Sequence, residues 1–331
     1  MSNTIRQHTD SDMKKKNLTS SETITNRTVS FLRELQAKFR ELAAGVYKRA
    51  KYLNLLPDPN SRADAQVLEK IGTLIPNTGR YEQQSLLKQI RIRAGQKGHR
   101  SLESYYRELT KNPEELDILK EKLTYVGSHF FRGAVWADLK AYCRDLSGNI
   151  EPGQKFRGWC AGCSSGKEVY SVLMVLADLF PADRIDLLAT DYNTEMLSKC
   201  REAVYTYNRF HEIPEEYRHY TEKYTPESRE EDNDSGEFRI RGELRDAVRT
   251  QKQDLLMDEY PAGFDLILCR NVIKFFRENV RTEVEQKLAD ALNPGGLLVL
   301  SDEVPQEMIA DPGSMHLTST GTKGIYRKNA D

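Results

Sequence analysis

The sequence predicts an α/β fold: a mostly parallel, Rossmann-like sheet that follows an all-helical domain and carries a small inserted β-subdomain. Three observations support this prediction. Strand-like and helix-like runs alternate from about residue 156, no strand pattern appears before about residue 150, and the alternation breaks between residues 204 and 250. Such alternation is typical of a parallel sheet with helices on both faces.

The first third of the chain divides into a polar tail and a helical domain. Residues 1–28 are rich in Ser, Thr, Asn and Lys, and we expect them to be disordered. Residues 29–125 form the helical domain, because apolar residues recur at helical spacing from Val29 to Leu53 and again further along. The later helical runs are expected at 62–73, 81–95, 101–110 and 113–125.

The sheet is expected in residues 126–331. Its strands are predicted at 156–160, 185–190, 264–269 and 297–301, and its helices at 167–180, 194–203 and 278–292. Within the insertion at about 204–250, Glu237–Arg241 and Ala247–Val248 read as short antiparallel strands. They follow an acidic loop from Pro226 to Gly236.

A turn of small residues between the first strand and the first helix of the sheet is the most informative local feature. It reads Ala-Gly-Cys-Ser-Ser-Gly-Lys-Glu over residues 161–168. Gly162 lets the backbone approach a ligand closely, and the helix that follows offers unpaired N–H groups. The turn lacks the Gly-x-Gly-x-x-Gly spacing of a dinucleotide site. It also departs from a phosphate loop, because Glu168 stands where Ser or Thr would bind magnesium.

Two later features support a nucleoside site. Asp191 ends the second predicted strand, where a carboxylate can hold ribose hydroxyls. A Pro-Gly-Gly turn at 294–296 precedes the last predicted strand. Together with the small-residue turn, these features favour a sheet that binds S-adenosylmethionine.

Composition excludes few partners but several protein classes. Lys plus Arg total 49 and Asp plus Glu total 50, so the net charge selects no partner. The sequence shows no apolar run long enough to span a membrane and no signal-peptide core, so we expect a cytoplasmic protein. Cys160 and Cys163 form a Cys-x-x-Cys without a second metal-binding pair, so we expect packed thiols and no metal site.

A cluster of basic residues lies in the predicted helical domain. Between residues 86 and 107, six cations stand against Glu103 alone. They are Lys88, Arg91, Arg93, Lys97, Arg100 and Arg107. Two interpretations stay open: an ordinary solvated helix face, or a docking face for an acidic partner. Nucleic acid is not expected, because the patch is short and the protein is not basic overall.

Four segments of the chain resemble a known family, the bacterial chemotaxis receptor methyltransferases of the CheR type. They are Ser128–Arg132, Ser164–Ser171, Ala189–Glu195 and Cys269–Val272, within a likeness that runs from about Phe39 to Tyr326. The resemblance implies an N-terminal helical domain followed by a class I methyltransferase domain. It further implies methyl transfer from S-adenosyl-L-methionine to chemoreceptor glutamates, with S-adenosyl-L-homocysteine as product. The partner would be an acidic helix bundle of a chemoreceptor. We expect this protein to bind it as a monomer, through Lys88, Arg91, Arg93 and Lys97.

The resemblance also implies roles for residues of this chain. Ser128 and Arg132 would touch the cofactor, Arg132 also near the transferred methyl group, and Asp191 would hold the ribose. Gly162 belongs to the cofactor turn. Asp254 and Leu255 would flank the adenine, and Arg270 and Asn271 would lie near the methionine end.

Asp254 stands where the family usually has Asn, and two further departures bear on the reaction. Lys167 stands where the family usually has a Glu that meets the methionine amino group, and Phe275 stands where it has a Tyr near the reaction centre. A Lys at that position would repel the ammonium group. Two further hypotheses therefore stay open: a signalling module with weakened or lost catalysis, and a methyltransferase for another protein or a small molecule.

Overall fold

The computed structural model describes residues 62–75, 77–123, 127–148, 150–151, 153–225, 236–302 and 309–330. All of them belong to one compact unit, Arg62–Asp331. The predicted tail at 1–28, the predicted helix Val29–Leu53 and most of the acidic loop at 226–236 lie outside the described residues.

The four later helical runs predicted for the first third are confirmed. They form α2 (Arg62–Leu74), α3 (Gln83–Gln96), α4 (Leu102–Leu109) and α5 (Pro113–Leu123). Ile71, Ile90, Tyr105 and Leu119, one from each helix, are completely buried in a shared core. Helices this short depend on such a shared core, because an isolated helix of their length is marginal in water.

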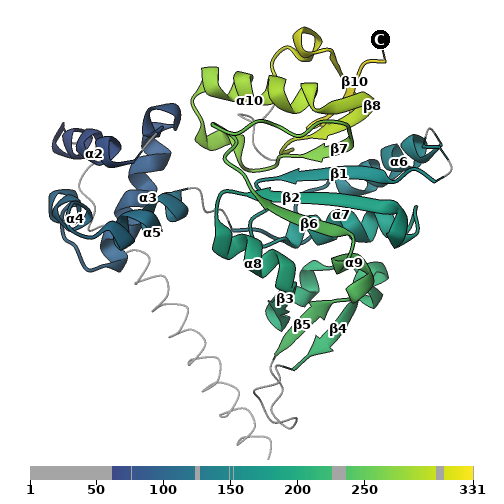
Figure 1. The fold of residues 1–331 in the computed structure, drawn as a ribbon, viewed down its shortest axis with the longest axis horizontal. Helices are drawn as coiled ribbons and strands as arrows, with labels where there is room; N and C mark the ends of the chain where they lie inside the picture. The colour runs from purple at the N-terminus through teal and green to yellow at the C-terminus, as the bar shows by residue number, and fades with distance from the viewer. Residues whose placement is uncertain are drawn as a thin grey trace, which may run out of the picture. The chain divides into compact units, whose positions relative to one another are not determined.

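The main sheet has seven strands in the order β6-β2-β1-β7-β8-β10-β9. The strands are β1 (Phe156–Ala161), β2 (Ile185–Asp191), β6 (Val248–Lys252), β7 (Phe264–Leu268), β8 (Leu292–Val299), β9 (Leu317–Ser319) and β10 (Ile325–Lys328). The first five in this spatial order pair in parallel, and β10 pairs antiparallel with both β8 and β9. This order, with one antiparallel strand near the edge, is the arrangement of a class I methyltransferase sheet, so the predicted fold class is confirmed (Figure 1).

Helices cover both faces of the sheet, as the alternation predicted. One core packs α6 (Trp136–Ser147) and α7 (Lys167–Ala177) against the sheet, with Leu139 and Leu173 completely buried. The opposite core packs α10 (Glu278–Asp290) against the other face, with Val284 completely buried. The helix α8 (Thr194–Glu202) follows β2. The helix α6 was not predicted from the sequence, although its buried residues recur at helical spacing.

The insertion is smaller than predicted. It contains a separate antiparallel sheet in the order β3-β5-β4, made of β3 (Val204–Thr206), β4 (Thr221–Tyr224) and β5 (Glu237–Ile240), and the short α9 (Gly242–Arg245). Figure 1 shows this sheet beyond α8, away from α10. The interpretation of Ala247–Val248 as part of this sheet is wrong, because Val248 begins β6, which pairs in parallel with β2 in the main sheet.

Candidate active site

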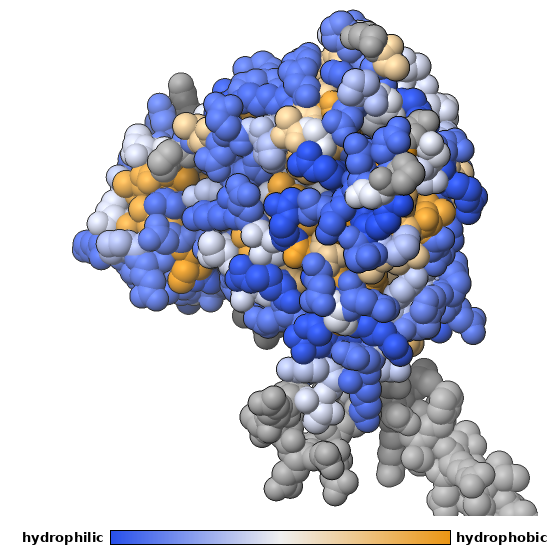
Figure 2. All heavy atoms as spheres, turned by 45° about the vertical axis from the view of Figure 1, so that its right-hand side comes forward, coloured by the Kyte–Doolittle hydropathy of each residue, from blue (hydrophilic) through white to orange (hydrophobic). Residues whose placement is uncertain are grey.

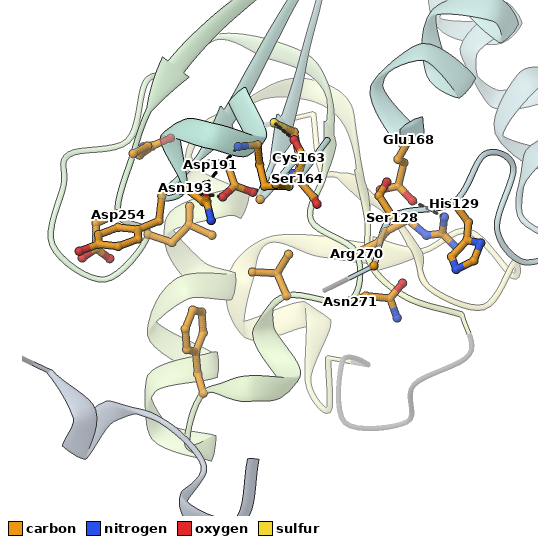
Figure 3. Close-up of a pocket in the computed structure, with 18 of the residues that line it drawn as sticks. Ser128, His129, Cys163, Ser164, Glu168, Asp191, Asn193, Asp254, Arg270 and Asn271 are labelled. Atoms are coloured by element: carbon orange, nitrogen blue, oxygen red, sulfur yellow. Dashed lines mark hydrogen bonds and ion pairs between the residues drawn. The ribbon is translucent and has the colours of Figure 1, made fainter. Parts of the chain in front are cut away.

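An open pocket lies where the parallel strands β1, β2, β6 and β7 end. It encloses about 900 Å³ of space, counting solvent at its mouth. Eight of the ten residues proposed for the site line it: Ser128, Arg132, Gly162, Asp191, Asp254, Leu255, Arg270 and Asn271. Figure 3 shows Asp191 and Asp254 toward one end of the pocket and Glu168, Arg270 and Asn271 toward the other. Ligands of open α/β sheets bind at this edge, outside the carboxyl ends of the strands.

The turn after β1 owes its shape to glycines. Gly162 has φ +75°, and a Cβ there would lie 2.5 Å from Val272 Cγ2. Gly166 has φ +83°, and a Cβ there would lie 2.5 Å from the Cys200 sulfur in α8. Both positions therefore exclude a side chain by conformation and by space. The N–H groups of Gly162 and Cys163 donate to the Thr190 carbonyl at 2.8 Å, which ties the turn to the end of β2.

Asp191 presents a carboxylate at the end of β2. Its Oδ2 accepts from the Ser164 N–H at 2.7 Å and its Oδ1 from the Asn193 N–H at 2.8 Å (Figure 3). Burial raises the pKa of this carboxyl above its usual value, although the backbone N–H groups of Asn193, Ser164 and Tyr192 oppose the shift. The N–H groups of Ser164 and Asn193 fix the carboxylate's orientation and leave lone pairs for a ligand's hydroxyls.

The opposite end of the pocket carries a charged network around Arg270. The guanidinium is completely buried and donates to Glu168 Oε2 at 2.6 Å and to Asp302 Oδ1 at 2.8 Å. Burial raises the pKa of Glu168, and Arg270 partly opposes this. For Asp302, burial also acts to raise the pKa, but the bonds from Arg270 and the Ala134 N–H outweigh it and hold the value low. Glu168 thus brings a paired carboxylate into the pocket wall.

Arg132 is held beside this network. Its Nη1 donates to Asn271 Oδ1 at 3.1 Å and its Nη2 to the Gly127 carbonyl at 3.2 Å. Asn271 adopts φ +61°, which is uncommon for a residue other than glycine, and its Nδ2 donates to Ser301 Oγ at 3.3 Å. Since these bonds use two of five guanidinium N–H donors, Arg132 keeps donors for an incoming carboxylate.

The end of the pocket near Asp254 is more apolar. Leu255 lies beside Asp254 there, and the sequence analysis missed several other lining residues, among them Tyr192, Met196, Val272 and Phe276. Tyr192 and Met196 follow Asp191 by one and five residues, so their proximity to it was a usable signal. An apolar slot next to a carboxylate that can accept ribose hydroxyls suits a purine base.

The structure corrects the predicted position of Lys167. This residue does not line the pocket: its Nζ donates to Ser165 Oγ at 3.0 Å and lies 5.1 Å from the centre of the Tyr205 ring. The next residue, Glu168, lines the pocket instead. One helical position rotates a side chain by about 100°, so neighbours at the start of α7 point in different directions.

Phe275 is the other predicted site residue that does not line the pocket. Phe276 lines the pocket, whereas Phe275 is half-buried beside Lys274. Its backbone carbonyl accepts from the Glu82 N–H at 2.7 Å. A role for Phe275 in the reaction stays a prediction.

The predicted basic face is only partly a surface. Arg91 is buried in an ion pair with Asp64, and Arg93 pairs with the buried Glu115 at 2.7 Å. Both arginines therefore belong to the packing of the helices and are unsuited to docking. Lys88, Lys97, Arg100 and Arg107 are exposed.

Among the described residues we find no disulfide and no group of side chains suited to hold a metal ion. Cys160 and Cys163 are buried free thiols. None of the described helices is long and apolar enough to cross a membrane. The face drawn in Figure 2 is mostly hydrophilic, with apolar residues in small groups.

Comparison with known proteins agrees with this geometry. Residues 127–311, more than half of the chain, match the family described as CheR methyltransferase, SAM binding domain. The chain belongs to the CheR methyltransferase family. It is an S-adenosylmethionine-dependent methyltransferase by that membership, and the matched range holds every pocket residue described above.

Several curated relatives share the family. A chemotaxis protein methyltransferase of Listeria monocytogenes is 29% identical over 243 residues, which cover 72% of this chain and 87% of that protein. One from Borreliella burgdorferi is 26% identical over 222 residues, 62% of this chain and 74% of that protein. One from Escherichia coli is 33% identical over 175 residues, 51% of this chain and 57% of that protein.

The pocket's donor set suits the CheR cofactor. S-adenosylmethionine combines a purine, a ribose diol and an amino acid with a methyl-bearing sulfonium, and when bound it supplies an electrophilic methyl group. The pocket offers, in the same order, an apolar slot, the buried Asp191 carboxylate and the charged network of Glu168 and Arg270. A negative Glu168 oxygen at this end of the pocket suits an ammonium group, so Glu168 is a candidate for the role that was expected at position 167.

Proposed function

We propose that this CheR methyltransferase methylates glutamate side chains of chemoreceptors and so serves adaptation in chemotaxis. The relatives described above are chemotaxis protein methyltransferases, which supports the chemotaxis setting. Arg132 is the observation that supports a carboxylate as the methyl acceptor. Its half-buried guanidinium lies beside the charged end of the pocket and has N–H donors beyond the two that bond to Asn271 and Gly127. Paired hydrogen bonds from a guanidinium are well suited to orient a carboxylate.

The proposed reaction needs little acid–base chemistry from the protein. A glutamate with a pKa of about 4.3 is already ionised at neutral pH. Its oxygen forms a bond to the methyl carbon while the carbon–sulfur bond breaks, and the electron pair stays on the sulfur. The protein's task is to hold two reactants in line, which can supply several kcal/mol of the barrier. Asp191, Glu168 and Asn271 would fix one reactant, and Arg132 would orient the other.

The position of Lys167 bears on the alternative of a module without catalysis. That hypothesis rested on Lys167 repelling the cofactor and on Phe275 lacking a hydroxyl. Since Lys167 contacts Ser165 and Tyr205 outside the pocket, only the Phe275 argument remains for it. We therefore favour the active enzyme.

The test is transfer of labelled methyl from S-adenosylmethionine to receptor fragments. We expect base-labile label on the fragments, the behaviour of a carboxyl methyl ester, and its loss with Arg132→Ala. Calorimetry with S-adenosylhomocysteine runs in parallel. Binding without label on any fragment would favour another substrate or the docking module, and absence of binding would refute the enzyme.

A further inference from the structure

We propose that Tyr81, in the segment between α2 and α3, is a cofactor-binding residue that forms part of the wall around the purine. Tyr81 lines the pocket although it lies 46 residues before the family match begins at residue 127. The proposal rests on the assignment of the apolar end of the pocket to the purine.

The first observation is the position of the Tyr81 ring. It packs edge-on against Phe276, with ring centres 5.4 Å apart, and both residues line the pocket. Asp254 and Tyr192, which also line the apolar end, lie close enough to Tyr81 to act on its charge. Burial is the main cause that raises the pKa of the Tyr81 hydroxyl, so the neutral ring faces the pocket at ordinary pH. A neutral aromatic wall suits the π-face of a base.

The second observation is that this segment is fixed to the sheet's loops on both sides of the slot. Its backbone pairs with the segment after β7: the Glu82 N–H donates to the Phe275 carbonyl at 2.7 Å, and the Arg277 N–H donates to the Arg80 carbonyl at 2.9 Å. The Arg80 side chain reaches the loop after β6, where it donates to the Leu256 carbonyl at 3.0 Å.

Arg80 also forms an ion pair with Glu283 of α10 at 2.5 Å. Backbone bonds and a paired side chain hold the Tyr81 ring in place without help from a ligand. A preformed wall binds a ligand at lower entropic cost than a mobile loop does. Residues Arg80–Glu82 thus make the helical part of the chain a structural component of the cofactor site.

The experiment compares Tyr81→Leu, which keeps apolar bulk against Phe276, with the full-length wild type. Tyr106→Leu is the matched control, because Tyr106 is a half-buried tyrosine of α4 outside the pocket. Affinities for S-adenosylhomocysteine and for adenosine are measured by calorimetry and competition. We expect Tyr81→Leu to weaken both ligands by the same factor, between about 5- and 150-fold, the range for losing an aromatic that stacks on a base. Tyr106→Leu should bind both ligands as the wild type does.

Hydrogen exchange of the wild type gives a readout that needs no variant. Bound S-adenosylhomocysteine should slow exchange of the Glu82 amide more than that of Thr110, at the end of α4. Unchanged affinity in a folded Tyr81→Leu, loss of S-adenosylhomocysteine affinity without loss of adenosine affinity, or no added protection at Glu82 would each overturn the proposal. A wild type that binds neither ligand would instead refute the cofactor site itself.

Discussion

Exchanging the charges at the start of α7 tests the position of the cofactor's amino-acid end. Glu168→Gln removes the carboxylate that lines the pocket, and Lys167→Glu adds one at the neighbouring position outside it. A hydrogen bond to a charged group contributes about 1.5–3 kcal/mol. We therefore expect Glu168→Gln to weaken S-adenosylhomocysteine binding by about 10- to 150-fold and Lys167→Glu to change it little.

Glu168 also pairs with the buried Arg270, so its loss has a second effect that needs a control. Asp302→Asn removes the other carboxylate partner of Arg270 at 2.8 Å, and Asp302 does not line the pocket. If the loss of affinity came from disturbing Arg270, both variants would weaken binding alike. If Glu168 contacts the ammonium group, Glu168→Gln should weaken it far more.

Isothermal titration with two ligands separates these effects. S-adenosylhomocysteine has the amino-acid group, whereas 5′-methylthioadenosine lacks it and keeps the purine and ribose. Glu168→Gln should weaken the first ligand and leave the second within about twofold. Our reasoning would be refuted by wild-type affinity in Glu168→Gln together with tighter binding in Lys167→Glu, since that pattern puts position 167 at the ammonium.

Three other perturbations have defined outcomes. Asp191→Ala should weaken S-adenosylhomocysteine by about 10- to 150-fold in calorimetry, because it removes the charged acceptor at the end of β2; an affinity within twofold of wild type would assign the ribose elsewhere. Arg93→Met should lower the free energy of unfolding by about 3 kcal/mol in urea titrations, because Glu115 is then buried without its main partner. The pKa of Glu115 is lowered in the folded protein, because the bonds from Arg93 and Tyr105 outweigh burial. The resulting stabilisation is present above the pKa of the unfolded state and is lost as the pH falls through the pKa of the folded state. This pH dependence should be missing in Arg93→Met. Reversing the exposed Lys88 and Arg100 to Glu should weaken receptor binding at low salt only, because exposed charges are screened within about 10 Å at 0.1 M; equal binding at low salt would assign them to ordinary solvation.

How far the sequence predicted the fold depended on how deeply each element is buried. The central strands β1, β2 and β7 have mostly buried residues, so their apolar runs stood out. In β6, by contrast, no residue is fully buried, because it is an edge strand in which every residue after Val248 is polar. Its pairing with β2 comes from backbone hydrogen bonds, which leave no hydrophobic pattern, and Val248 was therefore assigned to the wrong sheet.

The residues of the candidate site at strand ends were predictable from the sequence. Residues whose place depends on the direction of a side chain, or on a fold contact between distant parts of the sequence, were harder to predict. Gly162, Asp191 and Asn271 all follow strands that the sequence located, and all line the pocket. Lys167 was named from the family resemblance, and the sequence did not show that the first turn of α7 points Glu168 into the pocket and Lys167 away from it. No local pattern could place a residue before the sheet, such as Tyr81, in the pocket.

The buried charges at the amino-acid end show why the pocket tolerates a lysine at its edge. Arg270 is completely buried and takes up the charge of Glu168 and Asp302, so the network holds one cation against two carboxylates. Glu168 is the carboxylate of this network that lines the pocket, where it suits an ammonium ligand. Burial, with Arg209 nearby, lowers the pKa of Lys167, which weakens its hold on a proton. Lys167 also stays beside the Tyr205 ring of the insertion. Its side chain therefore lies outside the pocket lining, which removes the repulsion of the cofactor's ammonium group that the sequence suggested.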